Sequence, residues 1–129
     1  MKNKNVLIIL LSLFLFGFIG VQKDIWKAPE ESKKLKNPTT NFESSVVIGK
    51  KIYRSRCAVC HGRTGLGDGP GGKALVPKPE SLLTPLVLNQ TDGELFWKIS
   101  NGRNDMIKWG PILSEQQRWD LVNYIRKMK

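Results

Sequence analysis

The sequence predicts a small all-α domain, because three segments have helical patterns and the chain between them is irregular. Two of these segments open with a capping box, in which a Thr or Ser side chain and a Glu or Gln three residues later satisfy the first helical turn. The two boxes are Thr91-Asp92-Gly93-Glu94 and Ser114-Glu115-Gln116-Gln117. With 129 residues, the chain has room for one domain.

The first helix is expected over residues 44–60. Lys and Arg residues separate its apolar positions, which recur at helical spacing and are Val47, Ile48, Ile52 and Tyr53.

The second and third helices follow from their caps. The second starts after Thr91 and stops at Asn101-Gly102, with Leu95 and Ile99 as core residues. The third starts after Ser114 and is amphipathic. Its apolar face is formed by Trp119, Leu121, Val122, Ile125 and Met128, and its solvent face by Arg118, Arg126 and Lys127.

The five residues that end the first helix carry the main chemical signal. Cys57-Ala58-Val59-Cys60-His61 has the Cys-x-x-Cys-His spacing of a c-type haem attachment site. Two thiols three positions apart lie on one side of a helical turn, where both can bond to the vinyl groups of one porphyrin edge. His61, the only histidine of the chain, then becomes the proximal ligand of the iron. The sequence therefore predicts one covalently bound haem c, held by Cys57 and Cys60, which also completes the modest core of about 86 residues.

Three other interpretations of these residues have less support. A structural zinc site needs four ligands, and the chain has no further Cys or His to complete one. A dithiol redox motif is typical of a strand-helix-strand pattern, which is absent from this sequence. A plain disulfide is compatible with export but gives His61 no role.

Two features of the chain after the attachment site bear on the haem: a Gly-rich segment and a methionine. Residues 62–72 are rich in Gly and cannot form regular structure, and no Gly-Lys-Ser/Thr ending supports a phosphate-binding loop. Met106 lies 45 residues beyond His61, far enough to reach the opposite face of a haem, and polar residues flank it. We therefore predict Met106 as the distal iron ligand, with Lys108 as its nearby rival.

The N-terminal part of the chain has the composition of an export segment. Lys2 and Lys4 precede the apolar run Val6–Val21, so residues 1–22 are either a cleaved signal peptide or a membrane anchor. Both interpretations place the rest of the chain outside the cytoplasm, on the periplasmic side. Residues 23–43 are polar and charged and are expected to form an extended linker, followed by the folded domain at residues 44–129.

The charge of the chain is strongly positive. Its formal value is +10, and residues 43–129 hold 14 Lys or Arg and 8 Asp or Glu, a net charge of +6. No basic stripe is interleaved with aromatic residues, so nucleic acid is not an expected partner. We expect the basic surface to attract redox proteins with acidic docking surfaces. The candidate residues are Arg63, Lys73, Lys98 and Lys108.

Taken together, these motifs resemble the class I monohaem cytochromes c of bacteria over roughly residues 43–129. The resemblance rests on the stretch Gly49–Tyr53, the attachment site, the Gly69-Pro70 pair, the stretch 94–102, Met106 and the stretch Trp119–Ile125. It implies three main helices and loops wrapped around one covalently bound haem. It also implies that the Pro70 carbonyl accepts the His61 Nδ1–H and that Trp97 approaches a haem propionate. One departure is that Ile107, not Pro, follows Met106.

The expected function is electron transfer without catalysis. His/Met ligation fills both axial positions of the iron and leaves no vacancy for a substrate. The alternative is a haem-bearing electron-entry subunit of a membrane oxidoreductase, with a terminal oxidase or reductase as partner. A haem gas sensor would need an open sixth position.

Overall fold

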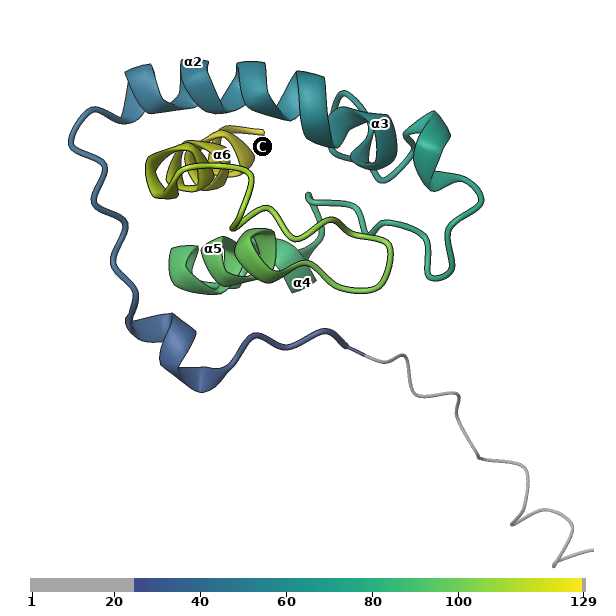
Figure 1. The fold of residues 1–129 in the computed structure, drawn as a ribbon, viewed down its shortest axis with the longest axis horizontal. Coiled ribbons are helices and arrows are strands. Elements are labelled where there is room, and N and C mark those ends of the chain that lie inside the picture. The colour runs from purple at the N-terminus through teal and green to yellow at the C-terminus, as the bar shows by residue number, and fades with distance from the viewer. Residues whose placement is uncertain (1–24, 129) are drawn as a thin grey trace, which may run out of the picture.

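The computed structural model describes residues 25–128, which form helices and loops with one isolated bridge, Arg103 to Met106. The expected all-α fold is confirmed. No helix within these residues is long and apolar enough to cross a bilayer. In Figure 1, α2 lies along one side of the molecule, with α6 packed beneath it and α5 beyond α6. The elements are η1 (Glu30–Lys34), α2 (Phe42–Ile52), η2 (Tyr53–Cys57), α3 (Ala58–His61), η3 (Pro70–Gly72), α4 (Pro85–Leu88), α5 (Asp92–Asn101) and α6 (Glu115–Lys127).

The first predicted helix is present and slightly longer than expected. Its N-cap is Asn41, whose side chain accepts a hydrogen bond from the Ser44 N–H at 3.0 Å. The helix passes through one π-helical turn at η2 and continues as α3. It ends at Gly62, whose φ of 79° is the left-handed conformation that favours glycine. A π turn widens the helix by one residue, and here it ends at the first cysteine, Cys57.

The buried face of α2 differs from the prediction. Val47 and Ile48 are 55% and 46% exposed, whereas Val46 is buried. The reason is Gly49, which faces α6 so closely that a Cβ there would lie 2.0 Å from the Asp120 carbonyl oxygen. The closest approach of the two helices therefore centres on Gly49, one residue away from the apolar pair that the periodicity selected.

The two capping boxes are confirmed. The Thr91 side chain accepts from the Glu94 N–H at the start of α5, and Ser114 and Gln117 form the same reciprocal pair at the start of α6. The helices pack through the rings of Phe96 and Trp119, which stack with centroids 4.0 Å apart and planes 16° apart.

The solvent face predicted for α6 is only partly exposed. Arg118 is half-buried, with its guanidinium over the Phe96 ring at 4.6 Å. Arg126 is also half-buried and donates to the Asp92 carboxylate at 2.8 Å and to the Leu88 carbonyl at 2.9 Å. Both arginines therefore contribute contacts between α6 and the segments of the same chain that pack against it.

Residues 25–39, which we call the arm, are packed on the domain and do not form the extended linker that was expected. Ser32 is 2% exposed. Its carbonyl oxygen lies so close to Gly93 of α5 that a Cβ on Gly93 would be only 2.0 Å from that oxygen. The Asn37 amide donates to Asp92 at 3.0 Å and to Asn123 at 2.7 Å. Figure 1 shows the arm running past α5 before it enters α2. These contacts are polar, so hydrophobic patterning gave no sign of them. Residues 1–24, which include the predicted export segment, lie outside the described part of the chain.

Candidate haem site

The three residues predicted to hold the haem lie on the last turns of the first helix. Cys57 ends the π turn, and Cys60 and His61 belong to α3. Both cysteines are half-buried and both thiols are free, so the structure contains no disulfide between them. Burial, with a smaller contribution from Cys60, raises the pKa of Cys57 to about 12. The two sulfur atoms are therefore available for covalent attachment.

The imidazole of His61 is the most distinctive polar group of the site. Within the described residues, its Nδ1 is buried and has no hydrogen-bond partner. Burial lowers the pKa of His61, and a backbone hydrogen bond with Glu80 acts in the opposite direction. A neutral imidazole is the form that binds iron. The expected hydrogen bond from Nδ1 to Pro70 is not made here, and this role of Pro70 stays a prediction.

Backbone contacts hold the loop that follows α3 against the attachment site. The Gly67 N–H donates to the His61 carbonyl at 2.9 Å, and the Gly69 N–H donates to the Cys60 carbonyl at 3.2 Å. A Cβ on Gly69 would lie 2.5 Å from the Val59 carbonyl oxygen, so only glycine fits there. The Gly-rich segment therefore packs directly on the turn that carries Cys60 and His61.

Tyr53 is a site residue that sequence reasoning assigned only to the core. Its side chain is 1% exposed, and its hydroxyl donates to the Gly62 carbonyl at 2.7 Å. This bond fixes the residue directly after His61 to the first helix. Only the position of Tyr53, eight residues before His61, could have suggested the contact, because a core aromatic has the same pattern.

Met106 lies on the loop between α5 and α6, residues 102–113, which we call the distal loop. Arg103 and Met106 form an isolated bridge, with N–H to carbonyl distances of 3.2 and 2.9 Å. The turn between them places Asn104 at a φ of 51°. The loop returns to α5 through the Trp109 N–H, which donates to the Ile99 carbonyl at 3.2 Å. Met106 is thus half-buried and held by backbone bonds, whereas its rival Lys108 is exposed.

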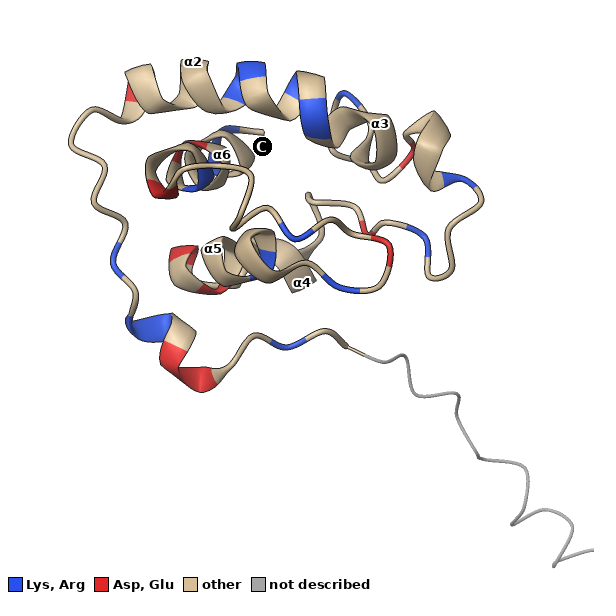
Figure 2. Ribbon diagram, viewed as in Figure 1, with Lys and Arg blue, Asp and Glu red and all other residues tan. Residues whose placement is uncertain are grey.

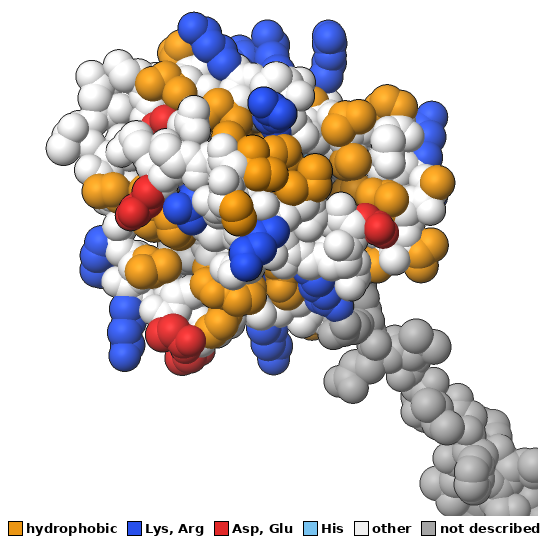
Figure 3. Space-filling view, in the orientation of Figure 1, with side chains coloured by type: hydrophobic (Ala, Val, Ile, Leu, Met, Phe, Trp, Pro, Cys, Tyr) orange, Lys and Arg blue, Asp and Glu red, His pale blue; other side chains and the backbone are white. Residues whose placement is uncertain are grey.

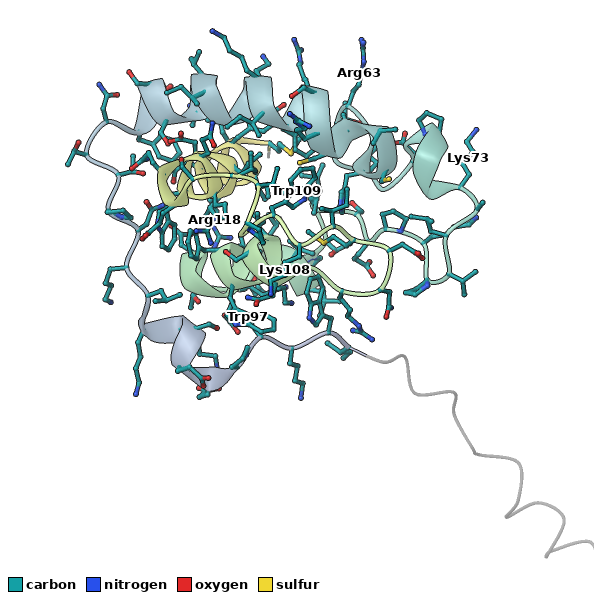
Figure 4. All side chains as sticks on the ribbon, in the orientation of Figure 1. Arg63, Lys73, Trp97, Lys108, Trp109 and Arg118 are labelled. Carbon is teal, nitrogen blue, oxygen red and sulfur yellow. The ribbon has the colours of Figure 1, made fainter. Side chains whose placement is uncertain are left out.

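The elements that carry the predicted ligands converge in one half of the molecule. Figure 1 shows α3, the loop that follows it and the distal loop together in the half opposite the start of α2. In Figure 4, Trp109 lies on the side of α5 that faces α6, and Trp97 lies on the side that faces the arm. Trp109 is 7% exposed and is the buried aromatic residue of the distal loop. The propionate contact expected for Trp97 stays a prediction.

Comparison with known proteins identifies the family. A family described as "Cytochrome C oxidase, cbb3-type, subunit III" matches residues 45–125. The chain belongs to the c-type cytochromes, as a class I monohaem member. It is similar to cytochrome c6 of a Synechococcus strain, with 28% identity over 87 residues that cover 67% of this chain and 73% of the relative. Cytochrome c6 of Porphyra purpurea is 26% identical over 86 residues, covering 65% and 72%. Cytochrome c6 of Pyropia yezoensis is 23% identical over 127 residues, covering 96% and 91%.

The family assigns covalent haem c, its iron and electron transfer to this cytochrome. The residues present fit that group, because two free thiols and a half-buried imidazole lie on consecutive turns, and the buried Nδ1 of that imidazole is free to make the hydrogen bond expected of a haem ligand. Within residues 25–128, no three His, Cys, Asp or Glu side chains gather as a cation site.

The charges of the cytochrome are spread widely, as Figure 2 shows. Arg63, Lys73 and Lys108 are exposed as expected. Lys98 is not a free surface cation: its Nζ donates to the Trp26 carbonyl at 2.6 Å and lies 5.1 Å from the centre of the Trp26 ring. Burial, the largest influence, lowers the pKa of Lys98. Figure 3 shows basic side chains interspersed with apolar ones on the visible face.

Proposed function

We propose that Cys57 and Cys60 form the thioether bonds to haem c, that His61 is the proximal ligand and that Met106 is the distal one. With this His/Met ligation the cytochrome carries single electrons between redox partners outside the cytoplasm. The observation that carries the proposal is that two free thiols and the half-buried imidazole of His61 lie together on the last turns of the first helix.

The haem supplies the one-electron couple, and the surrounding chain keeps its ligands in place. A thioether ligand favours Fe(II) and raises the reduction potential. The Tyr53–Gly62 bond restrains the chain beside His61, and the Arg103–Met106 bridge restrains the distal loop. Because separate restraints hold each ligand, little atomic movement accompanies the arrival or departure of an electron.

Covalent attachment is tested by making the protein in cells with haem-maturation machinery. Haem staining after denaturing electrophoresis, together with intact mass, should show one haem that acid-acetone does not extract. The Cys57→Ser, Cys60→Ser double variant should lose the stain. An unmodified mass for the wild-type chain would overturn the proposal.

Met106 ligation is tested with Met106→Ala. Loss of the soft ligand should remove the sulfur-to-Fe(III) charge-transfer band, lower the potential and allow carbon monoxide to bind the reduced iron. The matched control is Met128→Leu, because Met128 packs against the core beside Gly65 and a Met-to-Leu change conserves volume. A band that persists in Met106→Ala would show that another group is the distal ligand.

The exposed cations near the attachment site and the distal loop are proposed to steer partners with acidic docking surfaces. They are Arg63, Lys73 and Lys108. The association rate with the partner should fall as salt rises, because the screening length shortens to about 8 Å at physiological ionic strength. Lys73→Gln should weaken this dependence more than Lys50→Gln, which removes an exposed charge from α2. Equal effects of the two variants would contradict steering by this region.

A second candidate is a haem-bearing electron-entry subunit of a membrane oxidoreductase. The description of the matching family, which names an oxidase subunit, favours it. In this form residues 1–22 are retained as a membrane anchor, with a terminal oxidase or reductase as partner. Purification from membranes in mild detergent, followed by identification of the companion chains, separates a complex from a free carrier.

A further inference from the structure

The packed arm fixes the point at which the N-terminal segment leaves the folded domain. Residue 25 lies beside a groove of about 180 Å³ between the arm and the helices α4 and α5. The groove is lined by Trp26, Lys27, Lys33 and Leu86, among others. Because Ser32 packs against α5 and Asn37 is hydrogen-bonded to α5 and α6, this exit point is held in one place on the surface.

The docked arm shortens the connection to the apolar run. A flexible linker over residues 23–43 would have a typical reach of about 25 Å. Val21 and Ile25 are only four positions apart, and a fully extended chain spans about 14 Å over that distance. If the apolar run lies in a bilayer, the groove side of the domain must therefore lie close to the headgroups.

The chemistry of this side suits a bilayer surface. Ile25 and Leu86 are 48% and 42% exposed, and Trp26 offers the amphipathic ring that is enriched at membrane interfaces. Lys27 adds an exposed positive charge, which anionic headgroups attract, whereas the charge of Lys33 is paired with Glu30. The acidic groups of the groove are engaged: Glu30 pairs with Lys33 at 2.8 Å, and Glu94 accepts from the Thr91 N–H at 2.8 Å.

We propose that the face formed by Ile25, Trp26, Lys27, Lys33 and Leu86 rests on the bilayer that holds the N-terminal segment. The docked arm then fixes the orientation of the haem domain relative to the membrane. This inference rests on the membrane-anchored form proposed above. Electron transfer itself does not depend on it.

The test uses the full-length haem-loaded protein in lipid nanodiscs that contain anionic lipid. Leu86→Cys provides a single free thiol for a nitroxide, since the haem consumes Cys57 and Cys60, and Val47→Cys on α2 is the control at 55% exposure. The reduced protein is used so that the iron does not relax the label. The label at residue 86 should be accessible to oxygen and shielded from a water-soluble nickel complex, whereas the label at 47 should be accessible to both.

A second variant tests whether the docked arm, and not only the short connection to the N-terminal segment, holds residue 86 at the membrane. Gly93→Ala keeps α5 helical but places a Cβ against the Ser32 carbonyl, so it should release the arm and make the label at 86 accessible to the nickel complex. Without the Gly93 change, the proposal would be overturned if the label at residue 86 were accessible to the nickel complex. It would also be overturned if the protein shielded that label from both oxygen and the nickel complex. A mature form that begins after Val21 would overturn it as well. Haem stain and spectrum, recorded on the same samples, report separately on the proposed electron-transfer site.

Discussion

The α2–α6 crossing and the distal loop both depend on a glycine that has no room for a side chain, but the two glycines act in different ways. A Cβ on Gly49 would lie 2.0 Å from the Asp120 carbonyl oxygen, so Gly49 sets how closely two helices approach. Gly102 has a φ of 62°, and a Cβ there would lie 2.3 Å from the Met106 carbonyl oxygen. Gly102 therefore sets the course of a loop.

The surroundings of the two glycines differ as well. Buried side chains enclose the crossing, among them Tyr53, whose ring centre lies 5.2 Å from that of Tyr124. The distal loop contributes only Trp109 and Leu113 to the core and is otherwise held by backbone hydrogen bonds. Stability should therefore reside in the crossing, and the ligand geometry in a loop that can open locally.

The largest effect is expected at the crossing. Gly49→Ala should lower the free energy of unfolding by about 3 kcal/mol, because the helices must separate or shift to accept the methyl group. Urea unfolding followed by circular dichroism measures the change, and the charge-transfer band should be lost in the same transition.

The control for this variant is Val47→Ala, two residues earlier on the exposed side of α2, which should cost less than about 0.5 kcal/mol beyond its change in helix propensity. Equal losses in the two variants would show that the close contact at Gly49 does not determine stability.

A smaller and more local effect is expected in the distal loop. Gly102→Ala should cost about 2 kcal/mol, since a side chain is strained at positive φ and meets the Met106 carbonyl. Here the charge-transfer band should disappear at a lower urea concentration than the helical signal. Asn104→Gly, at the other positive φ of the loop, is the control and should keep the two transitions together. Coincident transitions in Gly102→Ala would mean that the loop and the helices unfold as one unit.

Helix positions were predictable from the sequence, because they depend on local patterns. The capping boxes at Thr91 and Ser114 define helix starts within a single turn of chain. The exact face of α2 was not predictable, because Gly49 determines it through a contact with α6, 71 residues away. The periodicity of α2 alone favoured Val47 and Ile48.

The docking of the arm and the hydrogen bond made by Tyr53 were unpredictable for a related reason. The arm is held by Ser32 and Asn37, whose residue types are equally common in exposed linkers. The sequence pattern already predicts Tyr53 as a core residue, so the hydrogen bond made by its hydroxyl adds nothing that the pattern could reveal. Polar contacts between distant segments leave no periodic trace in a sequence, whereas apolar burial does.

The smallest predicted effect concerns that hydroxyl, which links the stable half of the molecule to the attachment site. Tyr53→Phe keeps the ring but leaves the buried Gly62 carbonyl without its donor at 2.7 Å, so it should cost about 1 kcal/mol near neutral pH. Burial raises the pKa of Tyr53 above its ordinary value of 10.0. The folded protein then retains a proton that the unfolded chain loses above about pH 10, so wild-type stability should fall as pH rises through that range. Tyr53→Phe lacks this dependence, and the difference between the two proteins should shrink from about pH 8 to about pH 11. Urea unfolding at both values measures it, and a constant difference would show that the Tyr53 proton is not coupled to folding.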